Sequence, residues 1–428
     1  RKNLAVVRAG EYEGLKNKLK DSKWKPDFGT TDYSIAKHTG ATCISARDFL
    51  VAYNINLNTT STRRANAIAF DIRERGRVKR EGGKLTGKIV KDKDGNPVNI
   101  PGSLKEVKGI GWYIEEFGIA QLSLNLTNIS VTPVHVAFDE ACEKARNRGV
   151  RVTGSELVGL IPLQAMLDAG RYFLKKQQRS VGVSEKELIK IAVKSMGLDE
   201  LYPFVPEEKI IEYRLQDNKK KLVQLSASEF AEETASESVA PGGGSVSAYT
   251  GALGVSLGTM VANLSSHKRG WDDKWEIYSD YAEQGQKLKN ELLHLVDEDT
   301  NSFNKIIDAF RLPKSTSQEE KIRARAIEDA TKYAIEVPFR VMEVAYASMA
   351  LINDMVDKGN LSSITDGAVG ALCCRTAVAG AFLNVKINAK ELEDRKFAEE
   401  VIAKGKKLHD AAIKKEAEIL KLADKKTV

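Results

Sequence analysis

The sequence predicts a multi-domain protein in which α/β subdomains are followed by an all-α helical bundle. The 428 residues suffice for about two to four domains. Short β-rich runs give way to long helical periods near residue 216. The net charge changes there as well. Residues 1–220 carry 38 Lys and Arg against 27 Asp and Glu, or +11, whereas residues 221–428 carry 28 against 32, or −4.

The first part alternates strands and helices. Residues 49–57, 111–113 and 119–125 are β-rich, and residues 62–75 and 134–148 have a helical period. This pattern predicts an α/β or α+β unit.

A Lys- and Gly-rich insert occupies residues 77–108. Two apolar runs, 89–90 and 98–100, flank an Asp94-Gly95 turn, which predicts a hairpin arm. Its basic side chains face either solvent or an anionic partner, and a solvated arm is the favoured interpretation.

The second part is helical almost throughout, and Pro241, Pro313 and Pro338 are expected to interrupt its helices. One charge-free stretch, residues 246–264, is long enough to span a membrane. Its small residues and the negative mean hydropathy of the chain, −0.33, favour a closely packed buried helix and no membrane span. The predicted helices are residues 228–236, 244–265, 274–310, 317–358, 365–385 and 390–425.

Composition excludes several classes of protein. Apolar residues at 42% and charged residues at 29% are typical of folded globular chains, not of disordered or collagen-like ones. The four cysteines lack metal-ligand spacing, so we expect a reducing, cytoplasmic compartment. Because residue 1 is an arginine and the first methionine is Met166, we expect a further segment upstream.

A glycine-rich loop precedes the small-residue helix. Gly242, Gly243, Gly244 and Ser245 place backbone amides at a helix N-terminus, which favours an anion or a carbonyl oxygen. A simple turn explains the same residues, and the Lys-Ser/Thr ending of a phosphate-binding loop is absent from this motif.

Three acids, Asp297, Glu298 and Asp299, lie on an amphipathic helix. At helical spacing Asp299 shares a face with Leu295 and Phe303. The pattern leaves two interpretations open: a salt-bridged core carboxylate, or an acid/base with a raised pKa.

A third signal follows in the last part of the chain. Asp366 has the position of a helix cap, and Asn384 and Asn388 are one helical turn apart. Capping and buried polar packing explain these residues as well as ligand contacts do.

These three signals, in this order on one helical segment, resemble the formiminotetrahydrofolate cyclodeaminase family over residues 222–420. The preceding part resembles the glutamate formiminotransferase family, and the fusion of the two in this order is typical of bifunctional formiminotransferase-cyclodeaminases of histidine breakdown. The motifs that carry the second resemblance are Val7-Arg8-Ala9-Gly10-Glu11-Tyr12-Glu13, Pro26-Asp27-Phe28-Gly29, Ala46-Arg47, Gly109-Ile110-Gly111-Trp112-Tyr113, Gly154 to Pro162, Gly197-Leu198 and Tyr202-Pro203-Phe204.

The resemblance implies a two-step reaction on tetrahydrofolate as co-substrate, without a metal. The formimino group passes from N-formimino-glutamate to N5 of tetrahydrofolate, and N10 then closes onto that carbon, expelling ammonia to give 5,10-methenyltetrahydrofolate. The catalytic acid/base of the cyclodeaminase family matches Asp299. Folate contacts are implied for Gly242 to Ser245, with weaker candidates at Asp366, Asn384 and Asn388.

For the transferase half, the resemblance implies folate contacts between Gly29 and Gly40 and at Arg47. The family's catalytic histidine is expected upstream of these residues, and His38 does not match its motif. The implied folate-contact residues are Gly29, Thr30, Thr31, Asp32, Tyr33, Gly40 and Arg47. The expected domains are residues 1–49, the tail of the transferase N-terminal subdomain; 50–215, its C-terminal subdomain; 216–221, a linker; and 222–428, the cyclodeaminase.

Three other functions remain open. They are cyclodeaminase activity alone, a methenyltetrahydrofolate cyclohydrolase-like enzyme, and a non-enzymatic binding module. No recognition motif supports nucleic-acid binding. The expected partners are formiminoglutamate, folate in polyglutamylated form on the basic half, and further copies of the chain in a homo-oligomer built from dimers.

Overall fold

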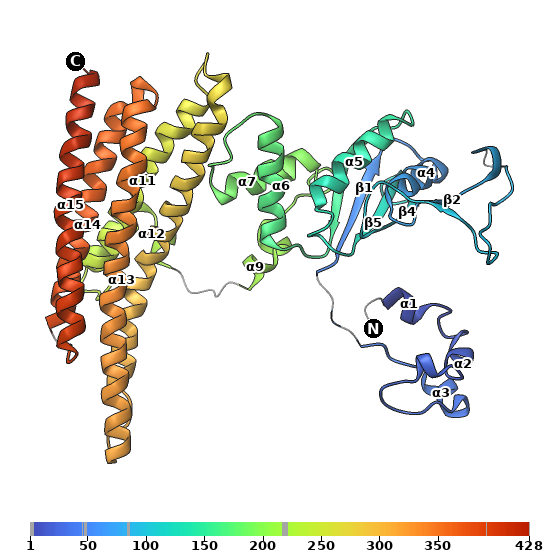
Figure 1. The fold of residues 1–428 in the computed structure, drawn as a ribbon, viewed down its shortest axis with the longest axis horizontal. Coiled ribbons are helices and arrows are strands. Elements are labelled where there is room, and N and C mark those ends of the chain that lie inside the picture. The colour runs from blue at the N-terminus through green and yellow to red at the C-terminus, as the bar shows by residue number, and fades with distance from the viewer. Residues whose placement is uncertain are drawn as a thin grey trace.

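The computed structural model describes residues 4–44, 46, 49–83, 86–215, 221–390 and 392–427. A bundle of long helices forms one end of the molecule, and a small sheet with its helices forms the other (Figure 1). The predicted order, an α/β part followed by an all-helical part, is therefore confirmed.

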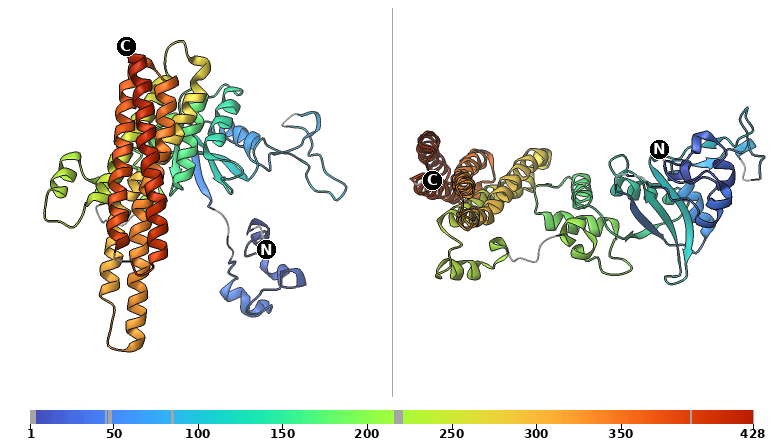
Figure 2. Two further views of the ribbon diagram at one scale, coloured as in Figure 1. Left: turned by 60° about the vertical axis from the view of Figure 1, so that its left-hand side comes forward. Right: turned by 90° about the horizontal axis from the view of Figure 1, so that it is seen from below.

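The first described segment consists of short helices that lie apart from the sheet (Figures 1 and 2). Leu15 and Ala36 are buried, whereas Phe28 is 94% exposed. The elements are α1 (Leu4–Arg8), α2 (Leu15–Lys18), η1 (Ser22–Trp24) and α3 (Tyr33–Thr39).

A four-stranded antiparallel sheet of order β4-β5-β1-β6 follows. Helices α4 and α5 pack against it. With the order β-α-β-β-α-β along the chain, this is a split βαβ arrangement. The main elements are β1 (Val51–Leu57), α4 (Thr62–Ile72), β4 (Val107–Ile114), β5 (Ile119–Leu126), α5 (Val134–Arg146) and β6 (Val152–Val158). Helices α6 (Leu163–Lys176), α7 (Glu185–Met196), α8 (Pro206–Lys209) and α9 (Ile211–Arg214) complete this half.

Strand β1 shows why the sheet has one apolar face. Val51, Tyr53, Ile55 and Leu57 are fully buried, and successive side chains of a strand point to opposite faces. These four residues therefore join the core with α4 and α5, and the residues between them face the other side of the sheet.

The predicted hairpin arm is confirmed and lies within the predicted insert. The Val98 amide donates to the Val90 carbonyl at 2.9 Å, as the sequence runs predict. Two short antiparallel strands close the base of the arm. These are β2 (Arg77–Val78) and β3 (Asn99–Ile100), with η2 (Glu81–Gly83) between them.

Small residues let α11 pack closely in the bundle. A Cβ added at Gly254 would lie 2.7 Å from Cys374 Sγ, and one at Gly258 would lie 2.9 Å from Leu351 and Ile352. The stretch 246–264 is therefore a tightly packed helix, as predicted. The bundle comprises η3 (Leu222–Gln224), α10 (Ala227–Thr234), α11 (Gly243–Ser266), η4 (Asp272–Lys274), α12 (Trp275–Phe310), α13 (Ser317–Lys358), η5 (Leu361–Ser363), α14 (Ile364–Lys390) and α15 (Arg395–Thr427).

Pro338 does not interrupt its helix, so that expectation was wrong. It lies inside α13, where its missing N–H leaves the carbonyl of Ala334 without the usual helical donor. Asn388 of α14 supplies a replacement, because its Nδ2 donates to the Ala334 carbonyl at 2.7 Å. A tertiary hydrogen bond thus compensates for the proline.

Among the described residues, one helical segment is long and apolar enough to cross a membrane by length and composition alone, Leu361–Lys390. It differs from the stretch singled out in the sequence. Of its most apolar window, 44% is buried inside the protein, which is typical of a core helix as well.

Candidate active site at the start of α11

The first turn of α11 is capped by a carboxylate from another helix. Gly242 is the N-cap residue and has no side chain to accept the free amides of that turn. Asp299 of α12 does so instead: its Oδ2 accepts from the Ser245 amide at 2.8 Å and from Ser245 Oγ at 3.0 Å. The glycine loop and the predicted acid therefore meet.

The electrostatics of Asp299 combine opposing effects. Burial raises the pKa of its carboxyl group above the ordinary value, and the two hydrogen bonds from Ser245 lower it in part. The net direction is upward. A carboxyl group with a raised pKa can take up and return a proton more readily near neutral pH.

At Gly244 the close approach of a polar side chain requires glycine, whereas a Cβ at Gly243 would make only an ordinary contact with one. A Cβ at Gly244 would lie 2.1 Å from Asp299 Oδ1, and one at Gly243 would lie 3.4 Å from Asn384 Nδ2. Asn384 also donates to the Gly380 carbonyl one turn earlier, at 3.0 Å. The structure therefore brings together the loop, Ser245, Asp299 and Asn384.

Two of the predicted contacts do not join this group within the chain. The amide of Asn388 is committed to the carbonyl of Ala334. Asp366 is in the first turn of α14, eighteen residues before Asn384, which is about 27 Å along a helix. The sequence pattern did not show that Asn384 lies beside the glycine loop and that Asp366 does not.

The acids beside Asp299 have other partners. Asp297 accepts a hydrogen bond from the Leu222 amide at 2.7 Å and so attaches η3 to α12. Burial raises the pKa of Glu298, but hydrogen bonds from Tyr333 and Asn301 and the nearby Lys305 lower it below its usual value. Of the three acids, Asp299 is the one that meets the glycine loop.

The predicted folate stretch of the transferase half forms a local cap on α3. Thr30 Oγ1 accepts from the Asp32 amide at 3.0 Å, and Asp32 accepts from the Ser34 amide at 2.8 Å. Hydrogen bonds from the side chain and the backbone amide of Ser34 lower the pKa of the Asp32 carboxyl group. The Tyr33 ring lies 5.8 Å from Lys16 Nζ. Gly29, Thr31 and Gly40 belong to the same segment, of which Gly40 is half-buried and the other two exposed, whereas Arg47 lies outside the described residues.

A polar network on the second face of the sheet was missed by the sequence reasoning. Gln121, fully buried, donates to Asn56 Oδ1 at 2.7 Å, and Asn56 donates to Glu200 Oε2 at 2.6 Å. Asn54 donates to Glu156 at 3.1 Å. Gln121 Oε1 is buried without a partner among the described residues. The signal was available, because asparagines alternate with apolar residues along β1.

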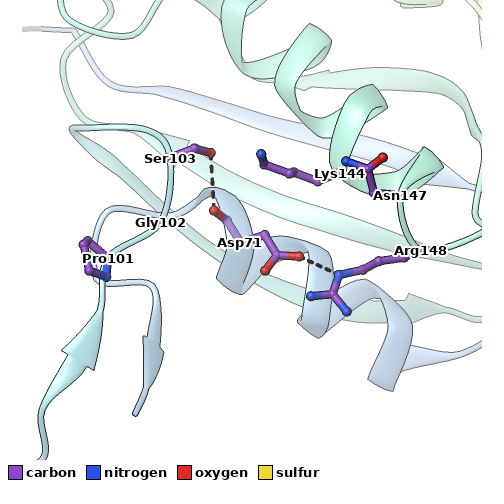
Figure 3. A pocket seen from close by; sticks show the side chains of 7 residues that line it. All are labelled: Asp71, Pro101, Gly102, Ser103, Lys144, Asn147 and Arg148. Atoms are coloured by element: carbon purple, nitrogen blue, oxygen red, sulfur yellow. Dashed lines mark hydrogen bonds and ion pairs between the residues drawn. The ribbon is translucent and has the colours of Figure 1, made fainter. Parts of the chain in front are cut away.

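A cavity of about 580 Å³ beside the arm is lined by charged side chains (Figure 3). Figure 3 shows the Asp71 carboxylate directed at Arg148, while Ser103 Oγ donates to the Asp71 carbonyl. Arg77 also pairs with Asp71, and Lys144 pairs with Glu140 at 3.0 Å. The basic side chains at this cavity are therefore already paired with carboxylates of the same chain. The cavity does not include Asp299. The described part of the chain holds no group of three or more metal-binding side chains.

Models of three protein domains match the chain. They are described as formiminotransferase domain, N-terminal subdomain, for residues 1–47; formiminotransferase domain, for 52–216; and formiminotransferase-cyclodeaminase, for 226–407. Together with the fold, they define a two-part enzyme with a transferase half and a cyclodeaminase half.

Curated relatives give the same result. The chain is 38% identical to the formimidoyltransferase-cyclodeaminase of Gallus gallus over all of its own length and 75% of the relative, and 38% identical to that of Mus musculus over 93% of the chain and 70% of the relative. It is 35% identical to the methenyltetrahydrofolate cyclohydrolase of Methylorubrum extorquens over 41% of the chain and 82% of the relative. The chain belongs to the bifunctional formiminotransferase-cyclodeaminase family. Because both domains are present, cyclodeaminase activity alone and a cyclohydrolase-like enzyme are not favoured.

Proposed function

We propose that the helical half closes 5-formiminotetrahydrofolate to 5,10-methenyltetrahydrofolate and that Asp299 carries the proton. The observation that carries this proposal is the Asp299 carboxylate, half-buried at the start of α11 with a raised pKa and in contact with the glycine loop. The family membership supplies the reaction, and the contact of Asp299 with the glycine loop supports this residue as the acid/base.

The chemistry requires one proton shuttle. N10 attacks the formimino carbon and forms a tetrahedral aminal, and its proton passes to the Asp299 carboxylate. Asp299 then protonates the amino group on that carbon, whose C–N bond breaks to release ammonia. Proton transfer by a positioned carboxyl group contributes roughly 100-fold or more. The Gly243 and Gly244 backbone and Asn384 would border the bound pterin and amidine.

The other half transfers the formimino group from formiminoglutamate to N5 of tetrahydrofolate. The polar second face of the sheet is the proposed site of this transfer, because Gln121, Asn54 and Asn56 place buried amide groups there. The basic excess of residues 1–220 favours folates with polyglutamate tails. Free thiols at all four cysteines fit the cytoplasm.

Self-association in a homo-oligomer is supported by an apolar stripe on α14. Val369, Leu372, Leu383 and Ile387 are 48%, 40%, 61% and 60% exposed and recur at helical spacing. Soluble monomers rarely expose long apolar patches, so a second copy of the chain is the proposed partner for this stripe.

Absorbance of methenyltetrahydrofolate tests the function in two assays. Supplied 5-formiminotetrahydrofolate tests the helical half, and tetrahydrofolate with formiminoglutamate tests both halves. Product formation in the first assay is the expected result. A purified, folded chain that leaves supplied 5-formiminotetrahydrofolate unchanged would contradict the cyclodeaminase assignment.

A further inference from the structure

A second cavity, of about 400 Å³, lies between α11 and α12, away from Asp299. Met260 and Leu264 give it an apolar wall, and both side chains are partly exposed, at 38% and 46%. The full lining is Ser256, Thr259, Met260, Asn263, Leu264, His267, Gln286 and Lys289.

Lys289 is a half-buried cation in this cavity without a counter-charge. Its Nζ donates to Gln286 Oε1 at 2.6 Å, and no carboxylate of the described residues lies within ion-pair distance of it. Burial lowers its pKa. The neighbouring Lys287, in contrast, pairs with Glu283 at 3.2 Å on the exposed side of α12.

The other polar groups that line the cavity are neutral, and no Asp or Glu is among the lining residues. The hydroxyls of Ser256 and Thr259 donate to carbonyls of their own helix, at 2.6 and 2.7 Å. Asn263 Nδ2 donates to the Gly182 carbonyl at 2.8 Å. The remaining donors are the free hydrogens of Lys289, the second amide hydrogens of Asn263 and Gln286, and one ring nitrogen of His267, whose pKa is lowered by burial and by Arg179. Asn263 Oδ1 is a buried acceptor without a partner among the described residues.

The cavity also borders the joint between the two halves. The α6–α7 loop reaches α12 (Figure 1), where the Val181 amide donates to Ser279 Oγ at 3.0 Å. Gln286 connects the cavity to this loop, because its Nε2 donates to the Gly182 carbonyl at 3.1 Å while its Oε1 accepts from Lys289.

We propose that this cavity binds a small amphiphilic carboxylate, with the carboxylate on Lys289 and the hydrocarbon body against Met260 and Leu264. The size fits, since ligand sites are typically about 300–1,000 Å³. A bound carboxylate neutralises the one uncompensated charge of the cavity.

Calorimetric titration of the full chain with hexanoate tests this site. We expect saturable binding that weakens at least about tenfold in Lys289→Met, because a charge-assisted hydrogen bond is lost. Lys287→Met is the matched control and retains wild-type affinity. Equal hexanoate affinity of Lys289→Met and wild type, or no saturable binding to wild type, would overturn the proposal.

Two further probes on the wild-type protein need no variant. 1-Hexanol has the same hydrocarbon body without the charge and should bind at least about tenfold more weakly. Inorganic phosphate has charge without the body and should not displace hexanoate. Equal binding of hexanol would refute the role of Lys289, and efficient displacement by phosphate would refute the amphiphilic ligand.

Discussion

At Asp299 two functions of a carboxylate coincide in one residue. The side chain caps α11 from a neighbouring helix, and the same oxygen atoms are the proposed proton shuttle. Asparagine can retain an oxygen acceptor for the Ser245 amide but cannot carry a proton. The two functions can therefore be separated by substitution.

Asp299→Asn should reduce ammonia release from 5-formiminotetrahydrofolate about 100-fold or more, with folding intact. The measurement is methenyltetrahydrofolate absorbance together with a circular-dichroism melt. Asp308→Asn, on the exposed part of the same helix, is the control and should retain activity. Near-normal turnover by Asp299→Asn would exclude this residue as the acid/base.

The raised pKa of Asp299 gives a stability prediction with a defined sign. Its folded pKa lies above the unfolded value of about 3.8, so its contribution is fully present below that value and is lost as pH rises through the folded pKa. Relative to Asp299→Asn, the wild type should lose unfolding free energy between acid and neutral pH. Chemical denaturation of both proteins at each pH measures this difference, and a difference that grows in favour of the wild type would contradict it.

The pairing of Asn388 with Pro338 is tested by a double-mutant cycle. Asn388→Ala leaves the Ala334 carbonyl without a donor and should cost about 1–3 kcal/mol of unfolding free energy. Pro338→Ala restores a backbone N–H, so the same Asn388 substitution should cost less in that background. Additive effects of the two substitutions would show that the hydrogen bond does not compensate for the proline.

At the scale of elements, the glycine loop needs glycine for close packing against Asp299 and not for conformational freedom. Gly244→Ala should displace Asp299, lowering both cyclodeaminase activity and the thermal midpoint, because its Cβ would overlap the carboxylate. Gly242→Ala is the structural control, since its Cβ would meet only the Val239 carbonyl, at 4.0 Å. The control should keep the wild-type midpoint, and equal midpoints for all three proteins would contradict the argument.

The apolar stripe of α14 predicts the outcome of sedimentation velocity. The wild type should sediment as a species larger than the 47.1 kDa chain, and Leu383→Asp should shift it toward the monomer. Ile322→Asp changes an equally exposed apolar residue, 57% accessible, on α13, and should leave the assembly unchanged. A monomeric wild type would remove the basis for this prediction.

The sequence was a good guide to elements and a poor one to contacts between them. Residues 317–358 were predicted as helical, with an interruption at Pro338, and they form the single helix α13. The bounds were predicted correctly because helical period is a local property. The pairing of Asp299 with Ser245 joins residues 54 apart, and only the meeting of α11 and α12 creates it. Asn388 was a weaker candidate for a folate contact, with buried polar packing as an equal alternative. Nothing local reveals that a helix continues through Pro338 and that the Ala334 carbonyl needs the Asn388 amide. The segment between Gly29 and Gly40 is different, because the hydrogen bonds of its cap join residues only two positions apart. Such local bonds can be read from a sequence.

At the scale of the whole molecule, the two halves are joined by more than the chain between them. Ser180, Val181 and Gly182 of the transferase half are buried against α11 and α12. A Cβ at Gly182 would lie 2.2 Å from that of Ala282, so a larger residue has no room.

Gly182→Val should undock the α6–α7 loop while each half stays folded. We expect a larger radius of gyration in small-angle X-ray scattering, with unchanged circular dichroism. Arg179→Ala alters an exposed side chain of the same loop and should scatter as the wild type does. Identical scattering curves for Gly182→Val and the wild type would show that the loop does not fix the two halves.

This docking limits how far the two halves can be exchanged between relatives as independent modules. Consider a chimaera in which a transferase half from a relative is joined at residues 216–221. Its α6–α7 loop would not match the surface of α11 and α12 on which this chain docks its own loop. Its glycine, the two amides that hold the Gly182 carbonyl, and Ala282 would have to be inherited as a set. A chimaera is therefore expected to keep its halves docked only if these residues of the joint are transferred together.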